Sequence, residues 1–221
     1  MRDTDKTKKS DRTRALLVNC AIEIFSIKPA KSVTFAEIAR LAEITPQAIY
    51  RYFPQKKDLH LAAIGYDFEL LMRSVLEKMN PNELPSLSGR LWEHFVEESK
   101  NHPLASRAIV SRRGPILDYI DGLESTTELV NHLSTELEIA QRLGLVRTDL
   151  PLAGIARSLK RYLVFNNLPL LFEGKFNAPE WYEVTNVILA VLFYPFPDLA
   201  VPEALTEFRG KINSALKQAR G

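Results

Sequence analysis

Five residues in the N-terminal quarter carry side chains that can read DNA: Thr45, Pro46, Gln47, Tyr50 and Arg51. The Gln47 amide can pair with adenine through two hydrogen bonds, and Arg51 can reach guanine or phosphate. The hydroxyls of Thr45 and Tyr50 can donate to phosphate oxygens, and the Pro46 ring can contact a thymine methyl group. This combination predicts a surface that binds double-stranded DNA.

Two short helices joined by a tight turn are expected to position these residues, in the stretch TFAEIARLAEITPQAIYRYF (34–53). Thr34 is a good N-cap for the first helix. The second helix is expected to start at Thr45 with Pro46 at its first position, where a missing N–H is tolerated. Small or apolar residues fall where the two helices must touch: Ile38, Ala39, Ile44 and Ile49. The spacing predicts a helix-turn-helix.

The flanking segments predict further helices on both sides of this stretch. Apolar residues recur at helical spacing over 11–27, and Pro29 ends that helix. Residues 1–10 lack apolar periodicity, which predicts a flexible basic arm that can touch backbone phosphate. Another long helix is expected from Pro54 to about Met79, leaving the DNA-binding unit as a mechanical connector.

The composition is that of a globular chain, and its excess of positive charge lies near the N-terminus. The 221 residues are 46% hydrophobic and 25% charged, and the single cysteine excludes an internal disulfide. Residues 1–60 hold 12 Lys or Arg against 7 Asp or Glu, a balance of +5, whereas the net charge is +2, so the remainder balances at −3. No secretory signal and no apolar run of about 20 residues is present. We therefore expect a cytoplasmic protein with no membrane partner.

The rest of the chain predicts an all-α protein. Helices are expected over 87–100, 103–113, 116–143, 152–172, 179–194 and 203–219, with a Pro-containing linker over 80–87. The helices at 152–172 and 179–194 are apolar on more than one face. Such helices favour burial against a partner chain.

No catalytic or metal-binding spacing is recognisable, and neither a Walker loop nor a GxGxxG motif is present. We therefore expect no enzymatic activity, no metal site and no cofactor. Aromatic residues of the later helices are candidates for a ligand pocket, with packing in the core as the alternative: Tyr66, Trp92, Phe95, Tyr119, Tyr162 and Phe165.

Residues 14–64 resemble the DNA-binding domain of TetR-family transcriptional regulators. The positions that carry the resemblance are Ile24-Phe25, Thr34, Ile38-Ala39, Ala42-Glu43-Ile44-Thr45, Ile49-Tyr50-Arg51-Tyr52-Phe53, Lys56 and Leu59. Two residues depart from the family pattern, since Pro29 and Glu43 stand where the family has glycine. A non-glycine residue in the turn is conformationally costly, and the Glu43 carboxylate repels phosphate unless it is paired.

The resemblance implies a three-helix DNA-binding domain over 11–54 and a helical ligand-binding and dimerisation domain over 55–221. It implies a homodimer formed through 152–172 and 179–194. It also implies that Thr34, Tyr50, Tyr52 and Lys56 clamp the DNA backbone. The expected function is a repressor that binds a palindromic operator and is released by a small molecule. The alternative is a DNA-binding dimer that is regulated by a protein partner or is not regulated by a small ligand.

Overall fold

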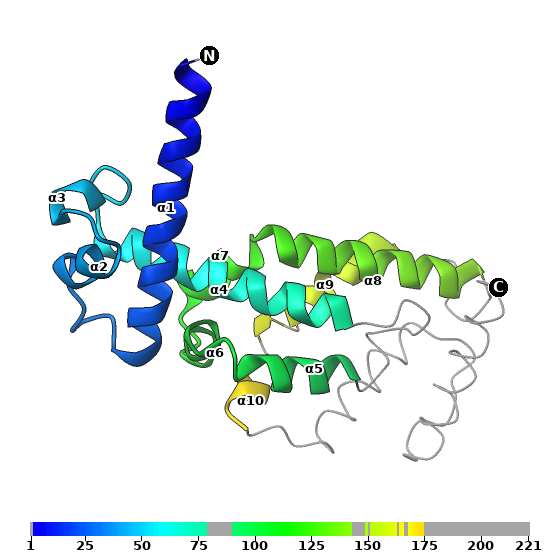
Figure 1. Cartoon of the computed structure of the whole chain (residues 1–221). Coiled ribbons are helices and arrows are strands. Elements are labelled where there is room, and N and C mark those ends of the chain that lie inside the picture. The colour runs from blue at the N-terminus through cyan, green and yellow to red at the C-terminus, as the bar shows by residue number, and fades with distance from the viewer. Residues whose placement is uncertain are drawn as a thin grey trace.

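The computed structural model describes residues 2–78, 90–142, 149, 151–162, 164–165 and 168–174. Within these ranges every long regular element is an α-helix, in agreement with the predicted all-α class (Figure 1). The helices are α1 (Arg2–Ile27), α2 (Phe35–Leu41), α3 (Pro46–Ile49), α4 (Lys56–Lys78), α5 (Arg90–Ser99), α6 (Pro103–Val110), α7 (Gly114–Asp121), α8 (Glu124–Arg142), α9 (Leu152–Tyr162) and α10 (Leu168–Phe172).

Helix α4 joins the two ends of the molecule. Figure 1 shows α1, α2 and α3 gathered at one end, with α4 running from them into the remaining helices. The first part of α4 packs against α1, and the helix also contacts α5, α6, α7 and α8. The predicted domain boundary between residues 54 and 55 therefore falls just before a helix that belongs to the packing of both parts.

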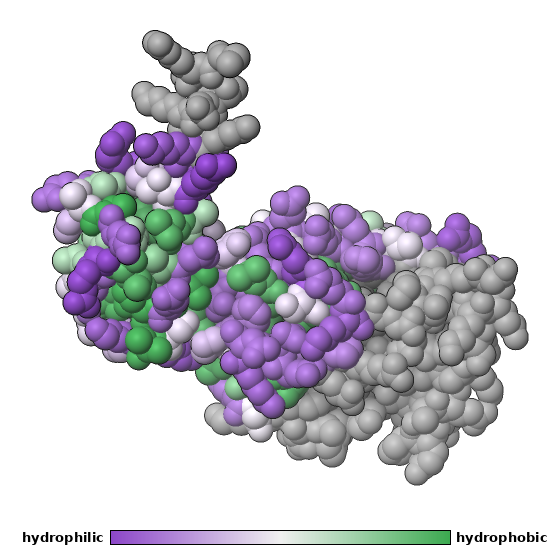
Figure 2. All heavy atoms as spheres, viewed as in Figure 1, coloured by the Kyte–Doolittle hydropathy of each residue, from purple (hydrophilic) through white to green (hydrophobic). Residues whose placement is uncertain are grey.

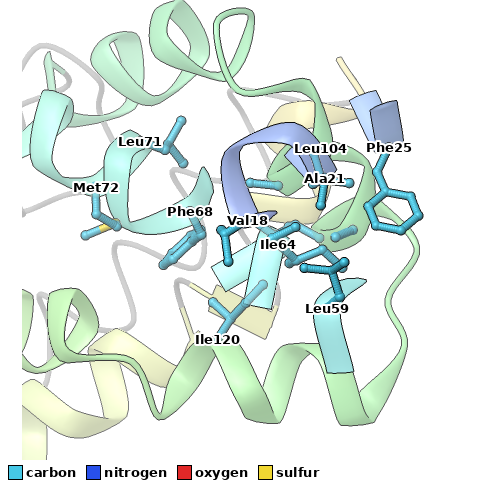
Figure 3. Packing of buried hydrophobic residues seen from close by; sticks show 14 of the residues in the cluster. Val18, Ala21, Phe25, Leu59, Ile64, Phe68, Leu71, Met72, Leu104 and Ile120 are labelled. Carbon is cyan, nitrogen blue, oxygen red and sulfur yellow. The ribbon is translucent and has the colours of Figure 1, made fainter. Parts of the chain in front are cut away.

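The hydrophobic core is continuous through this junction. Figure 3 shows Val18 and Phe25 of α1 among Leu59 and Ile64 of α4, with Leu104 of α6 beside them. All five are at most 5% exposed. Burying one such side chain stabilises the fold by about 1.5–3 kcal/mol. The apolar stripe of α1 therefore fixes the end of the molecule that holds the helix-turn-helix to α4.

The first helix begins earlier than the sequence predicts. The expected flexible arm over 1–10 is wrong for residues 2–10, because α1 extends from Arg2 to Ile27 as one helix. Lysine and arginine are good helix formers, and a helix that is already nucleated by its packed half extends at little cost. The absence of an apolar stripe in this segment therefore did not indicate disorder.

The predicted helix over 116–143 is two helices, α7 and α8, separated at Gly122 and Leu123. The fully buried Thr126 stabilises the break, because its single hydroxyl proton is shared between the carbonyl oxygens of Asp121 at 2.9 Å and Leu123 at 2.6 Å. Hydroxyl groups that bond nearby carbonyls in this way compete with helix continuation.

The predicted helix over 152–172 is described in part, as α9 and α10, and residues 164 and 165 between them are π-helical. Pro169 stands at the second position of α10, where proline favours the start of a helix over its continuation. The predicted linker over 80–87 and the predicted helices over 179–194 and 203–219 lie outside the described residues. Across the described ranges, no helix is both long and apolar enough to span a membrane.

Candidate nucleic-acid interface

A capping box fixes the start of α2. The Thr34 side chain accepts from the Glu37 backbone N–H at 3.3 Å, and the Glu37 carboxylate accepts from the Thr34 backbone N–H at 2.8 Å and from its hydroxyl at 3.0 Å. Lys28, from the connection after α1, donates to Glu37 at 2.7 Å. These donors lower the pKa of Glu37 to about 2, with Lys28 the largest cause. The N-cap that the sequence predicts at Thr34 is confirmed, and the T-x-x-E spacing carries the signal for the rest of the box.

The turn between α2 and α3 requires a left-handed residue. Glu43 has a φ of 53°, a conformation that favours glycine. The Ile44 N–H donates to the Ala39 carbonyl oxygen at 3.0 Å, which closes the turn behind Glu43. The expected conformational cost of a non-glycine residue at this position is therefore present in the structure.

Helix α3 turns its polar residues outward. It is short, Pro46–Ile49, with Thr45 as N-cap and Pro46 in its first turn, as predicted. The side chains of Thr45, Pro46 and Gln47 are exposed, whereas Ile49 is fully buried against the core. The Thr45 side chain makes no capping hydrogen bond, so its hydroxyl is free to meet a ligand. One face of α3 is thus fixed by packing and the other is open.

The residues after α3 divide between surface and core. Tyr50 is 57% exposed and meets the ring of Phe35 edge-on at 5.0 Å, which orients the phenol while its hydroxyl stays in solvent. Arg51 is exposed, whereas Tyr52 is partly buried and packs against the hydrophobic core. Phe53 is buried, with the Arg14 guanidinium over its ring at 5.0 Å. The exposed set is therefore Thr45, Pro46, Gln47, Tyr50 and Arg51.

Two of the predicted backbone clamps also have partners within the protein. The Lys56 ammonium donates to the Val33 carbonyl oxygen at 2.7 Å, which ties the start of α4 to the segment before α2 and uses one of its three donors. The Thr34 hydroxyl proton is directed at Glu37. Sequence reasoning did not find the link between Lys56 and Val33, because these residues are 23 positions apart.

Figure 2 shows hydrophilic side chains around an apolar area over the end of the molecule where Figure 1 places α2 and α3. Leu41, 44% exposed, is one of the apolar residues at this end. Exposed cations near the helix-turn-helix include Arg40, Arg51 and Lys57. These positive charges are what a surface that binds phosphate needs.

Of the residues predicted to line a ligand pocket, the four whose side chains are described differ in burial. Phe95 is fully buried in the core, while Tyr66 and Tyr119 are more than one-third exposed. Phe165 is partly buried and stacks under the Arg161 guanidinium at 4.8 Å. The side chains of Trp92 and Tyr162 lie outside the described residues. Among the described residues, no cluster of three metal-ligating side chains occurs.

Residues 17–63 match the family model of the bacterial regulatory proteins of the tetR family. YuxN of Bacillus subtilis (strain 168), an uncharacterised HTH-type transcriptional regulator, is 28% identical over 87 residues. That alignment covers 37% of this chain and 30% of the relative, so the chain spans less than a third of the length of this curated protein.

Solved structures share the fold over most of the chain. RolR in complex with resorcinol is similar with a TM-score of 0.59 and 17% identity, over 93% of this chain and 96% of that one. CprB of Streptomyces coelicolor A3(2), a TetR-family protein, has a TM-score of 0.50 and 19% identity, over 91% of this chain and 98% of that one. The family match places residues 17–63 among the tetR-family sequences, and the described helices share the fold of these solved structures.

Proposed function

We propose that the protein is a sequence-specific DNA-binding repressor that acts as a homodimer at a palindromic operator and is released by a small molecule. The observation that carries the proposal is the two-sided geometry of α3. Its Ile49 is fully buried, while Gln47, Tyr50 and Arg51 face solvent on a helix that the capped α2 supports. A rigid helix with open amide, phenol and guanidinium groups can enter a major groove.

Within this proposal, Gln47 and Arg51 read base edges, and Thr45 and Pro46 contact the adjacent backbone and thymine. Tyr50 clamps phosphate through its exposed hydroxyl. Lys56, Thr34 and Tyr52 hold the shape of the unit through the contacts described above, and any phosphate contact by them is an addition to that role. Two recognition helices of a dimer would lie about one turn of DNA, roughly 34 Å, apart.

Release by a small molecule would act through α4. This helix packs on α1 at one end and on α5, α6, α7 and α8 along its length, so a shift of α4 changes the position of the DNA-binding unit. A ligand that binds better to the shifted arrangement favours the form that cannot bind DNA. The structure of RolR with resorcinol supports a small aromatic effector as the first class to screen. In the proposed dimer, α9 and α10 lie at the interface together with residues 179–194.

Selection of bound fragments from random double-stranded DNA tests the DNA-binding half. We expect enrichment of an inverted repeat, with an affinity that falls steeply as salt rises because phosphate contacts release counterions. Gel-shift titration with the selected site and with a scrambled duplex measures the specificity. Equal binding to both duplexes, or enrichment of no sequence, contradicts the proposal.

A thermal-shift screen with small aromatic compounds tests the ligand half, with the selected duplex then titrated in the presence of each stabilising compound. A ligand that stabilises the protein and weakens DNA binding supports release by a small molecule. Sequence-selective DNA binding that no compound changes supports regulation by a protein partner, or none.

A further inference from the structure

An open cleft of about 370 Å³ lies where the end of α1 and the segment after it meet α4, α6 and α7. Its apolar lining comes from all four helices and includes Phe25, Ile64, Leu104 and Ile116. None of the aromatic residues that the sequence predicts for a ligand pocket lines it. The cleft therefore lies at the junction between the DNA-binding end and the helices behind it, away from those candidates.

The charged residues of the cleft are all basic. Lys28 and Lys31 follow α1, Arg107 lies on α6, and Arg113 caps the start of α7. No lining residue is a carboxylate, and Ser111 is the hydroxyl among them. Four cations from three segments of the chain around an apolar floor give this cleft a polarity that suits a negatively charged guest.

Two of the four cationic side chains already have partners within the protein. Lys28 pairs with Glu37 at 2.7 Å, and the Arg107 guanidinium donates to the Phe25 carbonyl oxygen at the end of α1. Within the described part of the chain, the side chains of Lys31 and Arg113 make no hydrogen bond or ion pair. Both are exposed at the rim. They are the groups that a bound anion would meet first.

The pKa of His60 reflects the burial and the positive charge inside the cleft. Its ring packs edge-on against Phe25 at 4.6 Å and is partly buried. Burial lowers the pKa of His60 most, followed by the positive charges of Arg113, Lys56 and Arg107. The imidazole is therefore neutral near pH 7 and offers a donor or acceptor without adding charge. The charges that disfavour a proton on His60 favour an anion beside it.

We propose that this cleft is a binding site for a small organic anion with an apolar body, of the aromatic carboxylate class. The ring would lie on Phe25, Ile64 and Ile116, and the carboxylate would meet Arg113 and Lys31. The volume falls within the range of small-molecule sites, and the mixture of apolar floor and few polar groups is typical of them. Carboxylate recognition by arginine is directional as well as electrostatic.

A ligand bound in the cleft would also affect the contact between α1 and α6. Its walls include Phe25, whose carbonyl oxygen accepts from Arg107, so a ligand there contacts the link between α1 and α6 directly. An effect on DNA affinity follows only if the proposed DNA-binding function holds. Binding of the anion does not depend on it, and the two are tested separately.

The test uses the full chain without DNA and isothermal titration with 1-naphthoate, against the neutral 1-naphthalenemethanol. We expect the carboxylate to bind about tenfold more tightly than the alcohol, because the rim cations act only on the charge. Arg113→Gln and Lys31→Gln should each weaken naphthoate about threefold or more and leave the alcohol unchanged. Lys100→Gln, which removes an exposed charge just after α5 and outside the cleft, is the matched control.

The His60 ring provides a second readout that does not rely on substitution. A carboxylate in the cleft should raise the pKa of His60, measured by NMR titration of its ring protons, and the alcohol should not. Absence of naphthoate binding at millimolar concentration, equal affinity for acid and alcohol, or affinity unchanged in both rim variants each overturns the proposal. Naphthoate binding by a protein that shows no sequence-selective DNA binding in the gel-shift titration would instead count against the proposed function.

Discussion

The carboxylate of Asp67 on α4 accepts hydrogen bonds from two groups at the start of α6. His102 Nδ1 lies 2.8 Å from Oδ1, and the Ala105 backbone N–H lies 2.8 Å from Oδ2. Asp67 is only 3% exposed. An ionised Asp67 carboxylate accepts from the tautomer of His102 that carries its proton on Nδ1. This contact joins the connector helix to the bundle behind it and satisfies an orphan amide of α6.

Replacing Asp67 should therefore destabilise the fold. Asp67→Ala leaves the Ala105 N–H without a partner in the interior, and we expect the free energy of unfolding to fall by about 2–4 kcal/mol. Urea denaturation followed by circular dichroism measures this. Glu77→Ala on the exposed side of the same helix is the control, with an expected change within about 0.5 kcal/mol. Equal effects of the two substitutions on the free energy of unfolding would show that the buried contact of Asp67 does not stabilise the fold more than an exposed side chain does.

Gln47 and Tyr50 should separate base reading from backbone clamping. Gln47→Ala should weaken binding to the selected operator by about 1–3 kcal/mol and leave binding to scrambled DNA nearly unchanged. Tyr50→Phe keeps the ring contact with Phe35 and removes only the hydroxyl, so it should weaken both duplexes to a similar degree. Gel-shift titrations of the two variants on both duplexes give the comparison. An equal loss of affinity for both duplexes in Gln47→Ala would show that Gln47 does not read bases.

The Glu43 turn should become more stable when glycine is introduced. Glu43→Gly relieves the left-handed strain, partly offset by the greater freedom of glycine in the unfolded chain, so we expect a gain of about 0.5–1 kcal/mol. Glu43→Gln retains the strain and removes the charge, so it should leave stability nearly unchanged. Thermal unfolding distinguishes them.

The same pair of variants addresses DNA affinity. Both remove the Glu43 carboxylate, so both should bind operator DNA more tightly at low salt, since a negative charge near phosphate is repelled. Tighter binding in Glu43→Gly alone would show that strain, and not charge, is what the turn contributes.

The Glu37 capping box should make the helix-turn-helix sensitive to acid. The pKa of Glu37 is depressed from 4.5 to about 2, so its contribution to stability is fully present above about pH 4.5 and is lost as pH falls towards 2. Glu37→Gln should flatten the pH dependence of stability in this window. Denaturation midpoints at several pH values between these limits provide the measurement, and Glu97→Gln, an exposed carboxylate of α5, is the control. An unchanged slope in Glu37→Gln would assign the acid sensitivity to other carboxylates.

Local signals within the sequence predicted much of the candidate DNA-reading surface. The N-caps at Thr34 and Thr45, the Pro46 helix start and the burial of Ile49 follow from capping, proline geometry and apolar spacing. Each depends on residues within about four positions, where the chain itself fixes the geometry. The length of α1 and the break between α7 and α8 were missed, because solvent-exposed helix and loop share a polar composition and because Thr126 bonds carbonyls only once the bend exists.

The sequence by itself determined an all-α chain with a helix-turn-helix whose polar face is Thr45, Pro46, Gln47, Tyr50 and Arg51. Only the tertiary structure decided what surrounds it. The Val33–Lys56 tie, the contact of Asp67 with His102 and the cleft that collects Lys31, His60 and Arg113 join residues far apart in the chain. Such groups meet because whole helices pack their apolar stripes together. The spacing of the polar residues along the chain does not reveal which of them become neighbours where the helices meet.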